Sequence, residues 1–302
     1  MAVIDAPPVS PRATVFWQLR RSGSVIAGGL IVSFMLLIAA MAPLLGTRNP
    51  GEVNPSVRNK LPGFEATIRD DDGNKVPVVY RFGTDSLGRD IYSRVIYGAR
   101  VSLIVGLTVS LISVGIGVVI GLLAGYVRWL DGVVMRLMDG LMAIPSVLLA
   151  IGLVSVFRAG LLAVVVAIVV PEVPRVVRLV RSVVLSIREE PFVESAITVG
   201  TPPLQLVVRH VLPNTVAPLI VHGTFICASA ILIEAILSFL GIGIPPEVPT
   251  WGNIMAEGRT LFRVFPHNIL YPGLFLAITV LGVNMLGDGL RDVLDPKRER
   301  RG

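Results

Sequence analysis

The stretch EPFVESAITVGTPPLQLVVRHVLPN, residues 190–214, lies between two long apolar segments and decides how the rest of the chain is interpreted. Phe192, Ala196 and Val199 recur at helical spacing, which predicts a short amphipathic helix. Gly200 is expected to end this helix.

The second half of the same stretch predicts another helix. Thr201 can cap its start, and Pro202 would occupy the first helical position, where a missing N–H costs nothing. The apolar stripe of this helix consists of Leu204, Val207, Val208 and Val211. Pro213 marks the return to an apolar segment. Together the two helices predict a hairpin that projects from a membrane.

The composition is that of a membrane protein. Of 302 residues, 53% are hydrophobic and 16% are charged, which is too apolar for an ordinary soluble domain. The net charge of +6 comes from arginines spread along apolar segments without interleaved aromatic residues, so nucleic-acid binding is not expected. A single cysteine, Cys227, excludes an internal disulfide or a cysteine metal cluster.

The N-terminal part predicts a basic flank and a membrane anchor. Residues 1–24 are expected to be cytoplasmic, and residues 25–46 to form the first transmembrane helix, because about 20 apolar residues span a bilayer. A signal peptide is the alternative, since Arg20 and Arg21 precede the apolar run and Ala40-Met41-Ala42 resembles a cleavage site. The run is longer than a signal sequence needs, which favours an uncleaved anchor.

Residues 47–98 are rich in Pro, Gly, Asn and Asp and predict an extracytoplasmic loop. Asp70, Asp71 and Asp72 precede Gly73, which raises the question of a calcium site. An EF-hand loop would need a closing glutamate where this chain has Arg81. A solvated turn is therefore the favoured interpretation.

Residues 99–290 are expected to form a core domain of five further transmembrane helices. In the uncharged run 101–127, Gly117, Gly121 and Gly125 share one helical face, which predicts close helix packing. The next expected span, residues 140–157, follows Asp139 and should be kinked by Pro145.

The fourth span has to be inferred from charge, because only a short apolar segment separates Arg158 from Glu172. The N-terminus, residues 128–136, residues 175–209 and the C-terminus contain more than half of the 27 Lys and Arg residues. Positive-inside counting therefore places both termini and the hairpin in the cytoplasm. Four spans must then precede the hairpin, so the fourth is expected from about residue 161 to about 178, with Glu172 and Arg175 near its cytoplasmic end.

The remaining spans are expected at residues 211–233, broken by Pro218, and at residues 268–287. An external loop with a short helix should occupy residues 241–268, and a cytoplasmic tail residues 291–302. Glu234 would lie in or near the membrane, where a carboxylate is usually paired or faces water. Structural hydrogen bonding, a place on the solute path and a proton relay remain open for it, and Asp139 is a second candidate for a polar site. The prediction is an all-α polytopic membrane protein with six transmembrane helices.

No catalytic motif accompanies these segments. The chain lacks a Gly-x4-Gly-Lys-Ser/Thr phosphate loop and a Gly-x-Ser-x-Gly elbow, so it is not expected to be an enzyme or to hydrolyse ATP itself. His210, His222 and His267 lie in different segments without metal-ligand spacing, and no metal site is predicted.

The opening stretch resembles the EAA loop of ABC importer permeases, which has Glu-Ala-Ala, three residues, Gly, nine residues and then Ile-x-Leu-Pro. The matching positions are Glu194, Ser195, Ala196, Gly200, Leu212 and Pro213. Ser195 replaces an alanine of the pattern, and His210 replaces its isoleucine.

Further segments narrow the resemblance to the C-type subunit of the dipeptide, oligopeptide and nickel group. They are FGTDSLGRD at residues 82–90, EAILSFLG at 234–241 and GDGLRDVLDP at 287–296. The similarity covers most of residues 15–297.

This resemblance implies a type I importer fold in a bacterial inner membrane. The implied partners are a second related permease, two ATPase subunits that hold ATP and Mg²⁺, and an extracytoplasmic solute-binding protein. Glu194, Ala196 and Gly200 would lie at the contact with an ATPase, and this chain would bind no cofactor. Dipeptides or oligopeptides are the expected cargo, with nickel chelates, glutathione or opines as alternatives. A passive channel would not need such a hairpin, and a membrane scaffold would explain the helices and the loop but predicts no ATPase partner.

Overall fold

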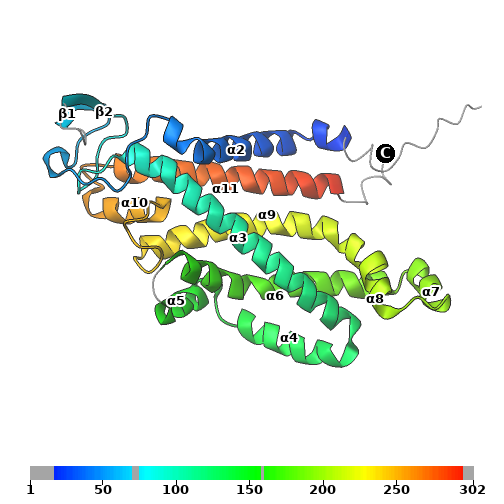
Figure 1. The fold of residues 1–302 in the computed structure, drawn as a ribbon. Helices are drawn as coiled ribbons and strands as arrows, with labels where there is room; N and C mark the ends of the chain where they lie inside the picture. The colour runs from blue at the N-terminus through cyan, green and yellow to red at the C-terminus, as the bar shows by residue number, and fades with distance from the viewer. Residues whose placement is uncertain (1–16, 70–74, 158–159, 295–302) are drawn as a thin grey trace, which may run out of the picture.

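The computed structural model describes residues 17–69, 75–157 and 160–294. Long helices run side by side along one axis, with a β-hairpin and α10 at one end and α7 and α8 at the other (Figure 1). The expectations for Asp70–Asp72, for Arg158 and for the tail beyond residue 294 concern residues outside these ranges.

The described residues form five long helices: α2 (Gly23–Ala40), α3 (Ile91–Tyr126), α6 (Leu161–Arg188), α9 (Leu212–Phe239) and α11 (His267–Leu294). The shorter helical elements are η1 (Ala42–Leu44), η2 (Pro55–Val57), α4 (Arg128–Met142), α5 (Ser146–Val156), α7 (Pro191–Thr198), α8 (Pro203–Leu206), η3 (Val207–Val211), α10 (Trp251–Gly258) and η4 (Arg259–Leu261). The strands β1 (Phe64–Arg69) and β2 (Lys75–Tyr80) pair antiparallel, with Phe64 opposite Tyr80.

Four helical stretches of the described chain are long and apolar enough to cross a membrane: α2, α3, residues 203–239 and α11. The bent pair α4 and α5 makes a fifth if it is counted as one span. Helix α6 does not qualify, because Glu172, Arg175 and Arg178 all fall within its first 18 residues. By length and composition, the described helices therefore support four or five spans. The expected count of six would require α6 to cross the membrane together with its charged side chains.

Several boundaries differ from the expected ones. The anchor helix α2 ends at Ala40 and is followed by η1. Helix α3 begins at Ile91 rather than near residue 99, because Asp90 caps it by accepting a 3.0 Å hydrogen bond from the Ser93 N–H. The preceding loop is thus shorter than 47–98, and it contains the β-hairpin.

The two prolines expected to disturb spans behave in opposite ways. At Pro145 the chain is extended, and α4 and α5 meet at an angle of 88°, so the expected kinked span 140–157 is instead two helices. Pro218 lies inside α9 without ending it, so the expected break in the fifth span is wrong. The last helix also continues past residue 287, to Leu294.

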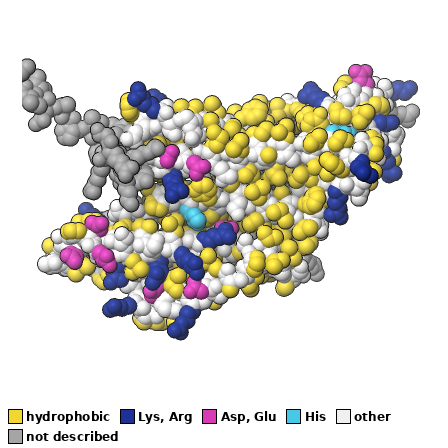
Figure 2. All heavy atoms as spheres, turned by 180° about the vertical axis from the view of Figure 1, so that it is seen from behind, with side chains coloured by type: hydrophobic (Ala, Val, Ile, Leu, Met, Phe, Trp, Pro, Cys, Tyr) yellow, Lys and Arg dark blue, Asp and Glu magenta, His cyan; other side chains and the backbone are white. Residues whose placement is uncertain are grey.

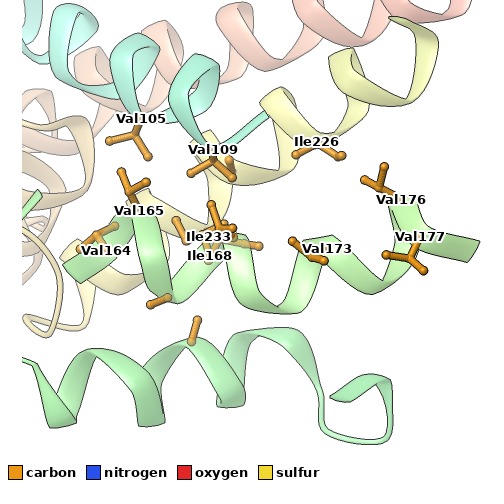
Figure 3. Close-up of a cluster of buried hydrophobic side chains, with 14 of the residues drawn as sticks. Val105, Val109, Val164, Val165, Ile168, Val173, Val176, Val177, Ile226 and Ile233 are labelled. Carbon is orange, nitrogen blue, oxygen red and sulfur yellow. The ribbon is translucent and has the colours of Figure 1, made fainter. Parts of the chain in front are cut away.

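The glycine face of α3 packs closely against α6, which confirms the packing predicted from its spacing. A Cβ added at Gly117, Gly121 or Gly125 would lie within 2.4–2.8 Å of a valine Cβ on α6. Those valines are Val176, Val180 and Val184, which repeat at the same four-residue interval. Figure 3 shows the adjoining core, where valine and isoleucine side chains from α3, α6 and α9 converge.

The outer surface carries a large apolar area. Helices α2, α3 and α11 expose leucine, isoleucine and phenylalanine side chains, among them Leu30, Phe34, Leu111, Leu274 and Leu281. In Figure 2 hydrophobic side chains dominate the middle of the molecule, whereas charged side chains gather towards its two ends. This distribution suits a molecule whose middle lies in lipid.

Candidate functional site

The turn of the hairpin is built by a left-handed glycine. Gly200 has φ +84°, and its N–H donates to the Ile197 carbonyl at 2.9 Å. The Thr201 N–H donates to the Ala196 carbonyl at 3.1 Å. These two bonds form a Schellman motif that ends α7. The predicted role of Gly200 as the end of the first helix is confirmed.

The second arm starts one residue later than expected. Pro202 is extended, at φ −67° and ψ 147°, and Pro203 is the first residue of α8. A residue that precedes a proline is sterically disfavoured in the helical region, so Pro202 cannot be the first helical residue that the sequence suggested. Thr201 is likewise not the capping residue.

The second arm continues into the long helix α9 without a break. After α8, residues Val207–Val211 form a π-helical turn, and Leu212 and Pro213 lie in the first turn of α9. The stretch 203–239 therefore counts as one 37-residue helix. Pro213 lies inside this continuous stretch and does not interrupt it.

Few of the apolar side chains in the hairpin are buried in this chain. Val193, Leu206 and Val211 are buried and anchor the arms. The outward-facing residues, called the hairpin surface below, are Phe192, Ile197, Val199, Leu204 and Val208. Val199 is 85% exposed and Leu204 is 77% exposed, on either side of the turn. The hairpin thus presents an apolar surface at the extreme end of the molecule, where α7 protrudes beyond the other helices (Figure 1).

The EAA-loop residues lie on this hairpin but do different things. Glu194 is exposed on α7. The Ser195 hydroxyl donates to the Pro191 carbonyl at 2.8 Å, which ties it to its own helix. His210, which departs from the pattern, places its ring 6.3 Å from the Phe192 ring and so links the two arms.

The two candidate polar residues outside the hairpin lie in separate places. Glu234 on α9 is fully buried. Its carboxylate accepts a 2.8 Å hydrogen bond from the Ser238 hydroxyl and a longer one, of 3.4 Å, from the Ser102 hydroxyl on α3. The hydroxyl of Thr250, just before α10, also bonds to it. Asp139 on α4 instead pairs with Arg178 on α6. Glu234 therefore has the polar partners that a buried carboxylate requires.

A buried ion-pair network at the α10 end was not singled out from the sequence. The Arg89 Nε lies 2.7 Å from the Asp85 carboxylate, and Arg89 also pairs with Glu257 on α10. Arg94, whose side chain is fully buried, lies 3.4 Å from Glu257. Burial raises the pKa of the Glu257 carboxyl, and the two guanidinium groups oppose that rise.

This network joins the loop before α3 to α10, which lie far apart in sequence. The Asp85 carboxylate also accepts hydrogen bonds from the N–H groups of Leu87 and Arg89, both at 2.9 Å. The i,i+4 spacing of Asp85 and Arg89 in the sequence indicates that these two residues can pair. Nothing in the sequence indicates that Arg94 and Glu257 join them. No group of three or more His, Cys, Asp or Glu residues in the described parts of the chain is arranged to hold a metal ion.

Comparison with known proteins agrees with this architecture. Residues 117–300 match the family model of the binding-protein-dependent transport system inner membrane component. The chain is 46% identical to a probable peptide ABC transporter permease protein, y4tQ, of Sinorhizobium fredii, covering 97% of this chain and 96% of the relative. It is 41% identical to the dipeptide transport system permease protein DppC of Alkalihalophilus pseudofirmus, covering 96% and 91%.

Other similarities extend the same picture. The glutathione transport system permease protein GsiD of Pectobacterium atrosepticum is 42% identical over 71% of this chain and 72% of its own length. Among solved structures, an inward-facing MetNI methionine ABC transporter chain superposes with a TM-score of 0.55 at 20% identity, over 66% of this chain and 96% of that chain. At this level of identity the likeness concerns the fold alone, and the fold of this chain is similar to that of a type I ABC importer permease. On the strength of the family match and the nearly full-length relatives, this chain belongs to the binding-protein-dependent transport system inner membrane components and is a multi-pass permease subunit of an ABC importer.

Proposed function

We propose that this chain forms half of the translocation path of an importer for dipeptides or oligopeptides, and that the hairpin surface docks on an ATPase subunit. The observation that supports this docking most strongly is the position of the hairpin surface. Apolar side chains at the end of the molecule, beyond the apolar middle, lie outside lipid and need a protein partner. A short helical hairpin with an apolar face fits a groove on such a partner.

The partners follow from the same proposal. A second related permease completes the path, two ATPase subunits bind ATP and Mg²⁺, and an extracytoplasmic binding protein delivers the solute. The hairpin and both termini lie in the cytoplasm, the β-hairpin and α10 lie outside, and the membrane is the bacterial inner membrane. The excess of arginine at the hairpin side supports this orientation.

Six residues form the proposed coupling contact: Glu194, Ser195, Ala196, Gly200, Leu212 and Pro213. Glu194 supplies an exposed charge next to the hairpin surface, and Gly200 sets the turn. Leu212 and Pro213 lie where the second arm enters α9, so that movement of the hairpin is passed directly to a membrane helix.

The peptide cargo is supported by the two relatives described as peptide and dipeptide permeases, each of which matches nearly the whole chain. Glutathione is the second candidate, because a glutathione permease is 42% identical over 71% of the chain. Uptake of a labelled dipeptide, with unlabelled oligopeptide and glutathione as competitors, distinguishes these solutes.

The coupling role is tested with Gly200→Val and a matched control, Gly63→Val. Both glycines have nearly the same backbone conformation, φ +84° and +83°, and a Cβ at either would meet open space. The two substitutions therefore impose a similar backbone strain at opposite ends of the molecule. Gly200→Val should abolish peptide uptake and solute-stimulated ATP hydrolysis, whereas Gly63→Val should retain both.

Copurification in mild detergent provides the partner test. The tagged wild-type chain should bring down a second permease and ATP-binding subunits, and Glu194→Lys should weaken recovery of the ATP-binding subunits alone. Recovery of neither partner with the wild-type chain would overturn the proposal. So would normal solute-stimulated ATP hydrolysis in both hairpin variants.

A further inference from the structure

A cavity of about 440 Å³ lies between α6, α9 and α11, away from the hairpin surface. Its walls are mostly apolar and include Leu179 on α6 and Val221 and Phe225 on α9. Two polar side chains also line it, His222 on α9 and Arg291 in the last turn of α11. A largely apolar cavity with a few converging polar groups is typical of a small-molecule site.

The polar groups of this cavity are cationic or able to donate hydrogen bonds. The His222 Nε2 atom is buried and has no hydrogen-bond partner among the described residues. Arg175 on α6, one turn before Leu179, is close enough to act electrostatically on His222. A buried ring nitrogen without a partner costs free energy, which a ligand that bonds to it would recover.

Arg175 is itself held in place from the protein side. Its Nη1 lies 2.8 Å from a carboxylate oxygen of Glu172, and the Glu172 side chain is only 1% exposed. The Ser229 hydroxyl on α9 also bonds to that carboxylate. The Arg175 side chain nevertheless remains 42% exposed, so the buried Glu172 carboxylate holds a guanidinium that is still accessible.

The charges show which side of the molecule contacts water. Helices α2 and α3 expose apolar side chains along their length, whereas α6 exposes Arg175 and Arg178 and pairs the latter with Asp139 of α4. Charged residues at membrane depth face a protein interior or a water-filled space rather than lipid. Figure 2 shows both signs of charge and a histidine on the rear face, in the half that carries α7 and α8.

We propose that the cavity between α6, α9 and α11 binds a carboxylate that is attached to an apolar side chain, the chemistry of the carboxyl-terminal residue of a peptide. Arg291 and His222 take the carboxylate, with Arg175 adding positive potential, and Leu179 and Phe225 receive the side chain. The site would hold the solute on its way through the chain. This inference rests on the proposed function, because it assigns a subsite to the proposed peptide cargo.

The test uses the complete transporter, with its partner chains, reconstituted in vesicles at a saturating concentration of loaded binding protein. Uptake rates are measured for one apolar dipeptide and for its carboxyl-terminal amide. Arg291→Gln and His222→Phe should each lower the rate for the free dipeptide about tenfold relative to the amide, as expected for the loss of one charge-assisted hydrogen bond. The binding protein is the same throughout, so a change in this ratio reports on the membrane subunit.

A second variant and a control exclude misfolding as the cause. Ala217→Phe fills the cavity without removing a charge, and it should slow uptake of both peptides while partner recovery and basal ATP hydrolysis persist. Arg100→Gln removes an exposed arginine near the α10 end and should leave the ratio unchanged. An unchanged ratio in Arg291→Gln and His222→Phe, in complexes that assemble normally, overturns the inference.

An anionic lipid offers the same chemistry as a peptide carboxylate, so the lipid composition is varied. The variants are compared in vesicles of phosphatidylcholine alone and of phosphatidylcholine with phosphatidylglycerol. A variant effect that appears only with phosphatidylglycerol assigns the cavity to lipid and overturns the inference. Absence of peptide uptake by the wild-type complex refutes the proposed cargo instead, so the two failures are distinguishable.

Discussion

Gly121→Ala is expected to destabilise the α3–α6 interface, although alanine is the better helix former. The added Cβ would lie 2.7 Å from the Val180 Cβ, 2.9 Å from its Cγ1 and 3.0 Å from the Val177 carbonyl oxygen. Carbon atoms pack best at about 3.5–4.0 Å, so α3 and α6 would have to separate. Overpacking of this kind costs about 1–3 kcal/mol.

Gly115→Ala is the matched control on the same helix. A Cβ at Gly115 meets nothing within 4 Å, so this substitution keeps only the helix-propensity gain of about 1 kcal/mol. Gly121→Ala has the same gain to set against its packing cost. The two variants should therefore differ in free energy of unfolding by about 1–3 kcal/mol, in favour of Gly115→Ala.

The measurement is thermal unfolding of both purified variants in one detergent, followed by the loss of helical circular dichroism. Gly115→Ala should unfold at or above the wild-type temperature, and Gly121→Ala several degrees below Gly115→Ala. Equal unfolding temperatures would show that the interface can open at no cost, and the close-packing account of this glycine face would then be wrong.

Two further predictions concern the buried polar groups. Asp85→Ala should lower the free energy of unfolding by about 3–5 kcal/mol, because among the described residues the buried guanidinium of Arg94 would keep Glu257 alone as a nearby countercharge. Hydrogen exchange in α10 should rise, and unchanged exchange there would contradict the role of the network. Glu234→Ala should cost about 2 kcal/mol or more through a cavity and unpaired hydroxyls, whereas Glu234→Gln should stay near wild type in unfolding temperature and uptake. A stable Glu234→Gln protein that no longer transports would show that the carboxylate charge itself is needed.

Features set by local spacing could be predicted from the sequence. Gly117, Gly121 and Gly125 indicated a tight helix contact because a four-residue repeat places them on one face of any α-helix. Gly200 indicated the hairpin turn for a similar reason, since the left-handed conformation that ends α7 is readily adopted by glycine. In both cases the properties of glycine alone are enough to predict the local structure.

Features that depend on neighbouring helices could not be predicted in this way. The helix is interrupted at Pro145 but continues through Pro218, although each proline lies in an apolar run. Proline removes one backbone hydrogen bond in either place, and the packing around it decides whether the helix continues. The second partner of Arg89 could not be predicted for another reason, because Glu257 is 168 residues away in the chain.

The unbroken run from Pro203 to Phe239 has a mechanical consequence. At 1.5 Å per residue it is a rod about 55 Å long, with the hairpin turn just before one end and Glu234, bonded to the α10 region, near the other. A tilt imposed at the hairpin cannot be absorbed by a loop, since the rod contains none. The π-helical turn at Val207–Val211 lies in this rod next to the hairpin, so a push on the hairpin reaches Glu234 and the α10 region through that turn and the helix that follows it.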